Sequence, residues 1–401
     1  MDVHPSDESL GYFLSSWRTW LLGLRSPIAG FVLITLFVIS PPRVFADETT
    51  SPVVAPKFLG SQTCSSSSCH GGAGEKSNQY TIWSTHDFHH ARPYATLETA
   101  RSERLAEVLK LGNPTQSARC TVCHAPFATV PADRLGHDAQ ISEGISCETC
   151  HGPAENWLRS HTRHDYTHAD RGAAGMRDLK NLYVRANTCV ACHQNIDPEI
   201  RAAGHPELIF ELDGQSVTMP RHWREERTPA DRWFVGQAVA LREMSAQLQS
   251  FPSLELSNRW AGLLWVLQRA GKPEILQTND EDIARVQKRF DGFAREIAMI
   301  PKEEPSANGL KQTVQQLSAS STAFEDKMIP VPLQARRAER LTLALDRLVI
   351  MLPGVTTNSA VNQSLNKLFA DAQSLPDFDP NQFAKDLNTF HSSVAGFLET
   401  K

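Results

Sequence analysis

The chain has 401 residues, a length that favours two domains besides any targeting segment. Its hydrophobic and charged fractions, 41% and 21%, are ordinary for a globular protein. A formal net charge of -5 offers no basic surface of the kind that binds nucleic acid, so nucleic acid is not an expected partner. The 15 histidines are many for this length, and most lie between His70 and His222, which is a first indication of metal chemistry.

Residues 1–46 are predicted to be an export signal that is cleaved. Arginines precede the apolar run 28–40, and the small residue Ala46 follows as a cleavage point. The alternative is an uncleaved membrane anchor, but this run is shorter than the roughly 20 residues that a spanning helix needs. The rest of the chain is therefore expected in the periplasm or otherwise exported, with membrane contact only if the segment stays uncleaved.

The remaining chain changes in composition near residue 228. After a polar linker at 47–57, residues 58–228 contain all eight cysteines, and their glycine and proline breaks predict short helices. Residues 229–401 contain no cysteine and show helical periodicity. We therefore expect a mainly α fold, in which an irregular domain of short helices precedes an all-α helical bundle.

Three stretches of the second part repeat apolar residues at steps of three and four, which is typical of amphipathic helices. Prolines at 252, 301, 330 and 353 mark the joints between helices. The three apolar faces consist of Phe234, Ala238, Leu241, Met244, Leu248 and Phe251; of Ile283, Val286, Phe290, Phe293 and Ile297; and of Ala338, Leu341, Leu345, Leu348 and Leu352.

The eight cysteines form four pairs, and a histidine directly follows each pair. The first pair has four residues between its cysteines, whereas the other three have two. The four motifs are Cys64, Cys69 and His70; Cys120, Cys123 and His124; Cys147, Cys150 and His151; and Cys189, Cys192 and His193.

This spacing predicts covalent attachment of haem c. Two thiols reach the two vinyl groups of one porphyrin, and the adjacent histidine becomes the proximal ligand of the iron. Zinc ribbons and redox dithiols also use paired cysteines, but neither requires histidine directly after the second one. Because all four pairs have that histidine and no cysteine is left over, we expect four iron-containing haems rather than zinc or disulfides.

Residues 58–227 resemble the tetrahaem cytochromes of the cytochrome c-554 family, which are known as electron carriers in hydroxylamine oxidation. The resemblance is carried by WSTHDFHHARPY at 83–94, by GISCETCHGP at 144–153 with His161 beyond it, and by Gly204-His205-Pro206. It implies that the histidines after the Trp-Ser segment and after the C-H-G-P block are sixth ligands to haems attached elsewhere in the sequence. It covers under half of the chain, so the family's partner and substrate are not transferred.

Nine further histidines accompany the motifs, and four haems use at most four of them as sixth ligands. The resemblance and the local setting favour His161, His205 on a turn beside Gly204, and His90, with His86 as the alternative to His90. A mainly bis-histidine set implies low reduction potentials as a class. The other five histidines are expected at the surface or beside propionates: His89, His137, His164, His168 and His222.

Two other residue types were weighed as haem contacts. Met176 and Met219 are expected to pack rather than to ligate iron. Five arginines lie near the motifs and suit haem propionates, because the guanidinium fork matches carboxylates. They are Arg119, Arg159, Arg163, Arg221 and Arg224.

Three functions remain open, and an electron carrier that exchanges electrons with redox partner proteins is favoured over an enzyme. The alternative is an oxidoreductase acting on nitric oxide, nitrite or hydroxylamine at a five-coordinate haem, for which the haem on His124 is the candidate. A structural or sensory module is disfavoured, because one haem would suffice for sensing. The helical domain is expected to dock a partner or a second copy, so an oligomer is possible.

Overall fold

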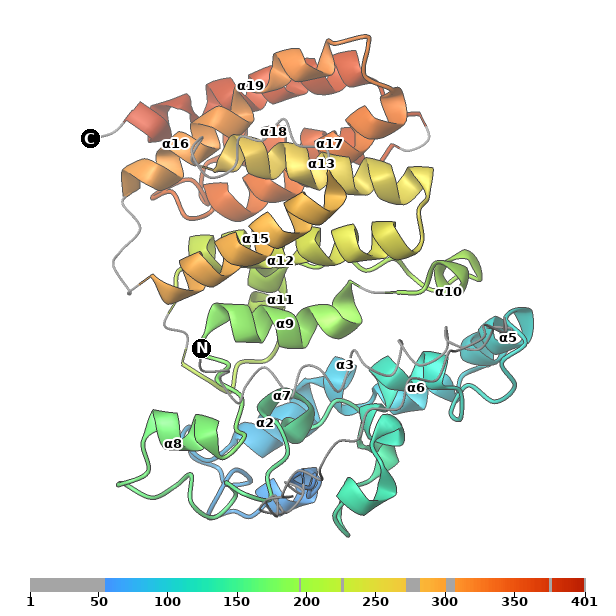
Figure 1. The fold of residues 1–401 in the computed structure, drawn as a ribbon. Helices are drawn as coiled ribbons and strands as arrows, with labels where there is room; N and C mark the ends of the chain where they lie inside the picture. Colours follow the sequence, from blue (N-terminus) through green and yellow to red (C-terminus); the bar gives the residue numbers. More distant parts are fainter. Residues whose placement is uncertain are drawn as a thin grey trace, which may run out of the picture. The chain divides into compact units, whose positions relative to one another are not determined.

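The protein is mainly helical, which confirms the predicted fold class (Figure 1). The computed structural model describes residues 55–194, 196–224, 227–271, 282–300, 307–374 and 377–399. Within these ranges the only strand-like pairing is an isolated parallel bridge between Phe58 and Leu135. The predicted export signal and most of the predicted linker lie outside them. No helix within them is both long and apolar enough for a membrane crossing.

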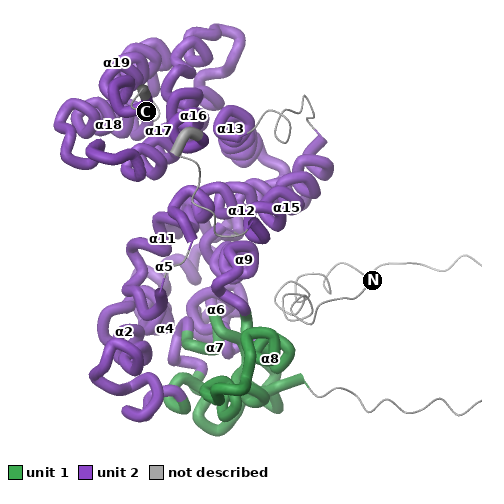
Figure 2. The backbone as a smooth tube through the Cα atoms, turned by 90° about the vertical axis from the view of Figure 1, so that its left-hand side faces the viewer, with its two compact units in different colours: residues 1–63, 130–140, 146–177 green, residues 64–129, 141–145, 178–401 purple. Residues whose placement is uncertain are grey.

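The chain forms two compact units whose boundaries differ from the domains expected from composition (Figure 2). The first unit comprises residues 1–63, 130–140 and 146–177, and the second comprises 64–129, 141–145 and 178–401. The third cysteine motif belongs to the first unit. The other three motifs belong to the second unit, together with the whole helical region.

The first unit has short elements joined by long loops. They are η3 (Ala132–Arg134), α7 (Cys147–His151) and α8 (His168–Ala173), and η1 (Ser61–Cys64) ends at its border. The parallel bridge joins Phe58 to Leu135, and the guanidinium of Arg134 lies over the Phe58 ring at 5.7 Å. Short helices here agree with the many glycine and proline breaks in this part of the sequence.

The second unit begins with short elements and continues into long helices. The short ones are α2 (Gln79–His86), α3 (Phe88–Ala91), α4 (Pro93–Leu97), α5 (Ala100–Val108), α6 (Ala118–His124), η2 (Pro126–Thr129), η4 (Ile141–Glu143), α10 (Pro198–Ala202), α11 (Leu212–Thr218) and η5 (Ser321–Phe324). The longer ones are α9 (Leu182–His193), α12 (Pro229–Ser250), α13 (Leu254–Ala270), α15 (Ile283–Met299), α16 (Ala307–Ser318), α17 (Val331–Val349), α18 (Ser359–Ala372) and α19 (Pro380–Glu399).

Each of the three apolar faces read from the sequence lies mainly on one long helix: α12, α15 and α17. Thr228 begins α12, because its side chain accepts the backbone N–H of Asp231 and Pro229 takes the first helical position. Phe251 differs from expectation. It follows the last helical residue and is 53% exposed, so the apolar face of α12 ends at Leu248.

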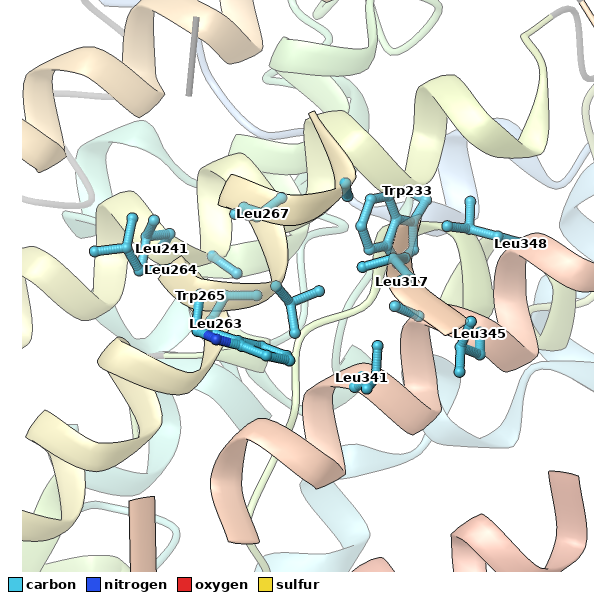
Figure 3. Packing of buried hydrophobic residues seen from close by; sticks show 14 of the residues in the cluster. Trp233, Leu241, Leu263, Leu264, Trp265, Leu267, Leu317, Leu341, Leu345 and Leu348 are labelled. Atoms are coloured by element: carbon cyan, nitrogen blue, oxygen red, sulfur yellow. The ribbon is translucent and has the colours of Figure 1, made fainter. Parts of the chain in front are cut away.

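One hydrophobic cluster fills the helical part of the second unit. α12 packs against α13 and α15, α13 against α17, and α18 against α19. Figure 3 shows Trp233 of α12 and Trp265 of α13 within this cluster, among leucines of α12, α13 and α17. Aromatic rings extend it, with Phe324 and Phe383 packed at 4.6 Å between ring centres.

Helix α9, which ends in the fourth cysteine motif, belongs to the same core. Leu182, Ala186 and Val190 are almost fully buried in the cluster, and α9, α11 and α12 lie side by side (Figure 1). The Tyr183 hydroxyl donates to Asp291 of α15 at 2.7 Å. The core therefore begins before residue 228, and the fourth motif is attached to it.

Truncation of Leu182 tests this anchoring. We expect Leu182→Ala to lower the free energy of unfolding by about 2–5 kcal/mol, because the leucine is fully buried and its loss leaves a cavity. Leu254→Ala is the matched control, since Leu254 is 78% exposed and its truncation should change stability by less than about 0.5 kcal/mol. Urea unfolding followed by circular dichroism measures both, and equal effects would contradict the anchoring.

Candidate functional site

The three regular cysteine motifs share one geometry: the motif histidine is the last residue of a helix. α6 ends at His124, α7 at His151 and α9 at His193. Residues three and four apart on a helix lie on the same face, so the two thiols and the imidazole of a motif project to one side. None of the eight cysteines, all within the described residues, forms a disulfide. This arrangement suits one flat group attached beside each helix end.

The wide first motif reproduces this geometry without a helix. The backbone N–H of His70 donates to the Cys64 carbonyl at 3.2 Å, which replaces the i to i−4 bond that an α-helix makes between these motif positions. The two extra residues bulge outward. A Cβ on Gly71 would overlap the Ser65 carbonyl oxygen, so the bulge requires glycine there. Gln79 of α2 accepts from His70 Nδ1 at 2.9 Å, which is the kind of bond that a ligating imidazole makes with its other N–H.

The third motif is organised by Glu148, which lies between its two cysteines and is fully buried. Its carboxylate accepts the backbone N–H groups of Leu59 at 2.9 Å, Gly60 at 2.6 Å and Ala154 at 2.6 Å. Hydrogen bonds to a charged acceptor are stronger than neutral ones. Glu148 thus joins the backbone at Leu59 and Gly60 to the loop after His151.

The loop beyond the third motif places His161 beside a tryptophan. The His161 and Trp157 rings make an edge contact at 5.5 Å, and His161 Nδ1 lies 2.7 Å from the Leu158 carbonyl oxygen. Arg177 is half-buried and donates to the carbonyls of Thr149 and Cys150, which holds the loop against α7.

Two of the segments that carry the family resemblance are in contact within the second unit, where Gly144 and Ile145 lie against the segment 83–94. Trp83 Nε1 donates to the Ile145 carbonyl at 2.9 Å, and the Ile145 N–H donates to the His90 carbonyl at 2.9 Å. Gly144 has a φ of +71°, and a Cβ there would lie 2.8 Å from the His90 oxygen. The backbone of His90 is therefore held by the residues just before the third motif.

Two pairs of histidines that are far apart in the sequence have rings that face each other within the pair. His90 and His193 have ring centres 6.2 Å apart with planes inclined at 74°. His124 and His205 have ring centres 6.3 Å apart with planes inclined at 78°. Each pair contains one motif histidine and one histidine favoured from the sequence as a sixth ligand.

The spacing matches that of two axial ligands on one iron. A metal–imidazole bond is about 2 Å long and the ring centre lies about 1 Å beyond the nitrogen, so trans imidazoles have centres roughly 6 Å apart. Edge-to-face packing of two rings also covers this distance. The hydrogen bonds of the ring nitrogens show which nitrogen of each ring is available to a metal.

In all four rings Nδ1 already has a partner other than the facing imidazole. His90 Nδ1 lies 2.9 Å from an Asp87 oxygen. His124 Nδ1 lies 3.0 Å from the Pro93 carbonyl, and His205 Nδ1 lies 2.8 Å from that of Pro206. Because a ligating imidazole donates its other N–H to such an acceptor, Nε2 is the atom left for a metal in each ring.

In the fourth ring, that of His193, the partner of Nδ1 is the side chain of Gln215. Gln215 Nε2 lies 3.1 Å from His193 Nδ1, while Gln215 Oε1 is buried with no partner. With the amide oxygen and nitrogen exchanged, Oε1 accepts from Nδ1–H, the arrangement that a ligating imidazole needs. Gln215 lies on α11, which packs on α12, so the helical core supports this imidazole.

Burial favours the neutral form of two motif imidazoles, those of His193 and His124, and metal ligation requires that form. Burial, with a smaller contribution from the positive charge of His90, lowers the pKa of His193 to about 4. Burial likewise lowers the pKa of His124. Burial alone would raise the pKa of Asp87, but its hydrogen bond and charge interaction with His90 bring that pKa below its usual value.

The second and fourth motifs approach each other through their cysteines. The thiols of Cys123 and Cys192 are hydrogen-bonded, and this bond lowers the pKa of Cys123 although burial opposes the change. The second cysteines of two different motifs are thus in contact. Groups attached to these two sulfurs would have neighbouring edges.

Other predicted residues have different surroundings. His86 is exposed and bonds Thr85 at 2.7 Å, so His90 rather than His86 faces His193. Two of the arginines considered for propionates pair with carboxylates: Arg119 with Asp197 and Glu199, and Arg163 with Asp165. His205 opposite His124 gives no support to an open position at that motif.

Three residues at the site were not singled out from the sequence, namely Asp87, Glu148 and Gln215, whereas His222, expected at the surface or beside propionates, is half-buried. Burial lowers the pKa of His222, whose ring donates to the Pro220 carbonyl and lies within electrostatic range of His70 and His90. Only Asp87 had a usable signal, because an aspartate three residues before a histidine is an N-cap spacing. The others act through residues far away in the chain.

Comparison with known proteins supports the cysteine motifs. Residues 63–152 match the family model of cytochrome c554 and c-prime. This range contains the whole of the first three motifs and the Trp83 segment. Comparison with curated proteins and with solved structures finds no significant match.

Substitution of Gly71 tests the bulged first motif. We expect Gly71→Ala to prevent correct closure of the loop between Cys64 and Cys69, so that the purified protein has one haem fewer than the wild type. Gly292→Ala is the control, because a Cβ at Gly292 meets nothing within 4 Å. Intact mass and pyridine haemochrome absorbance count the haems. A full complement in Gly71→Ala would show that the bulge does not need glycine.

Proposed function

Because residues 63–152 are those of a c-type cytochrome of the c-554 family, involved in electron transfer through covalently bound haem c, we propose that this chain is a periplasmic tetrahaem electron carrier. The proposal is carried by the two pairs of facing imidazoles, with ring centres 6.2 and 6.3 Å apart. In each of these rings Nδ1 is bonded to another group. The fourth cysteine motif lies beyond the matched residues and has the same helix-end geometry as the second and third.

The chain's donor groups fit four haems c. The attachment residues are the cysteine pairs at 64 and 69, 120 and 123, 147 and 150, and 189 and 192, with His70, His124, His151 and His193 as proximal ligands. When bound, each haem supplies a one-electron ferric/ferrous couple. The polypeptide holds the thiols and imidazoles in place before attachment, since α6, α7 and α9 present them on one face.

We assign His90 and His205 as sixth ligands opposite His193 and His124. Both favoured histidines then bind iron through Nε2, and their Nδ1 atoms keep the hydrogen bonds described above. His161 remains a candidate sixth ligand to a haem attached elsewhere in the sequence, as the family resemblance suggests, and His86 remains the alternative to His90. A haem with two histidine ligands favours electron transfer over binding of small molecules, because neither of its axial positions is open.

Two features support a carrier in particular. The contact between Cys123 and Cys192 brings two attachment points together, so adjacent cofactors would have the short separation that electron exchange requires. Attachment of α9 to the helical core holds the fourth motif rigidly. A rigid support limits reorganisation when the charge on the iron changes.

The cellular setting follows from the same proposal. Haem c attachment occurs outside the cytoplasm in this scheme, in agreement with a cleaved export signal at 1–46. The partners would be redox proteins that donate and accept electrons. The alternative, catalysis on a small nitrogen species at a five-coordinate haem, has no supporting contact at His124 and becomes an outcome of the test below.

A haem count with a spin-state spectrum tests the proposed function. We expect the mature exported protein to contain four haems by pyridine haemochrome, with a low-spin ferric spectrum that nitric oxide and cyanide leave unchanged. A protein without haem, or with zinc or disulfides at the cysteines, would refute the proposal. A high-spin fraction near about one quarter would instead favour the enzyme, since one haem of four would then be open.

Removal of one sixth ligand tests the axial assignment. We expect His205→Ala to leave four haems attached but to convert about one in four to high spin and to let the reduced protein bind carbon monoxide. His137→Ala is the control, because the His137 side chain is 99% exposed. An unchanged low-spin spectrum in His205→Ala would show that His205 is not a ligand.

A further inference from the structure

The carboxylate of Asp87 is bonded twice to His90. Its Oδ2 lies 2.9 Å from His90 Nδ1, and its Oδ1 accepts the backbone N–H of His90 at 3.3 Å as the N-cap of α3. Asp87 is 3% exposed, so water competes little for these bonds. One side chain therefore fixes both the helix start and the ring orientation of His90.

The other three imidazoles of the two facing pairs have different partners at Nδ1. Within the described residues, Nδ1 of His124 bonds the Pro93 carbonyl and the Thr96 hydroxyl, and Nδ1 of His205 bonds the Pro206 carbonyl. Nδ1 of His193 faces the amide of Gln215. Of these four rings, only His90 has a carboxylate as its partner.

A carboxylate acceptor makes an imidazole a stronger donor. It draws on the Nδ1 proton and raises the electron density at Nε2, which stabilises the ferric over the ferrous state of a bound iron. Outer hydrogen bonding of this kind is one of the ways in which a protein sets the reduction potential of a haem. A neutral carbonyl or amide acts in the same direction but more weakly.

We propose that Asp87 is a positioning residue that lowers the reduction potential of the haem attached at Cys189 and Cys192 below that of the haem attached at Cys120 and Cys123. The inference rests on the proposed function, because it needs haem at both motifs and His90 as an axial ligand. It gives these two haems different reduction potentials, and the cause is the hydrogen bonding of their axial histidines alone.

Asp87→Asn tests the inference on the mature tetrahaem protein. Asparagine is as good an N-cap as aspartate, so α3 keeps its start while the carboxylate charge is removed. In a spectroelectrochemical titration at pH 7 we expect one of the four midpoint potentials to rise by ~59 mV, which is a tenfold change in the equilibrium constant of a one-electron reduction. The other three potentials should change far less.

Two further variants keep the test decisive. Asp87→Ser also retains a capping side chain and should raise the same potential. Asp282→Asn is the matched control, because Asp282 is the N-cap of α15, accepting the Arg285 N–H at 3.0 Å, and the sequence of α15 contains no histidine. It should leave all four potentials unchanged.

The outcomes separate this inference from the proposed function. Four unchanged potentials in Asp87→Asn, with full haem content and a low-spin spectrum, would overturn the role of Asp87 and leave the carrier intact. An equal rise of all four would do the same, because it would reflect a general charge effect. Absence of haem from the wild type would instead refute the proposed function itself.

Discussion

The site depends on one constraint, the placement of two imidazoles on opposite sides of a point where a single metal ion fits. His90 faces His193 at 6.2 Å and His124 faces His205 at 6.3 Å. Such pairs persist only if each ring is held from behind, because an imidazole that is free to rotate would turn towards other partners. The hydrogen bonds at Nδ1 supply that support, and most of the surrounding structure serves to hold their acceptors.

The helical region has a physical connection to the redox site. α9 inserts Leu182, Ala186 and Val190 into the helical core and ends in the fourth motif. α11 packs on α12 and presents Gln215 to His193. The helical segment after residue 228 thus supports the fourth motif through packing, and α11 adds one side-chain amide beside His193.

Local strain and burial occur next to the attachment motifs. Gly71 permits the bulge of the first motif, and Gly144, at a φ of +71°, lies against the backbone of His90. Glu148 is buried inside the third motif with three backbone N–H groups as partners. These residues bind no metal themselves, yet they fix the positions of those expected to do so, which is how outer contacts shape a metal site.

The sequence alone determined the attachment pattern and the mainly α fold, because both depend on short-range spacing: two thiols and a histidine within a few residues, and apolar residues at helical period. It also narrowed the sixth ligands to a few histidines. Only the tertiary structure decided that His90 rather than His86 faces His193, and that His205 faces His124. The same holds for Gln215 and for the Cys123–Cys192 contact. These contacts join residues far apart in the chain, and their geometry arises from the packing of whole helices, which no local spacing encodes.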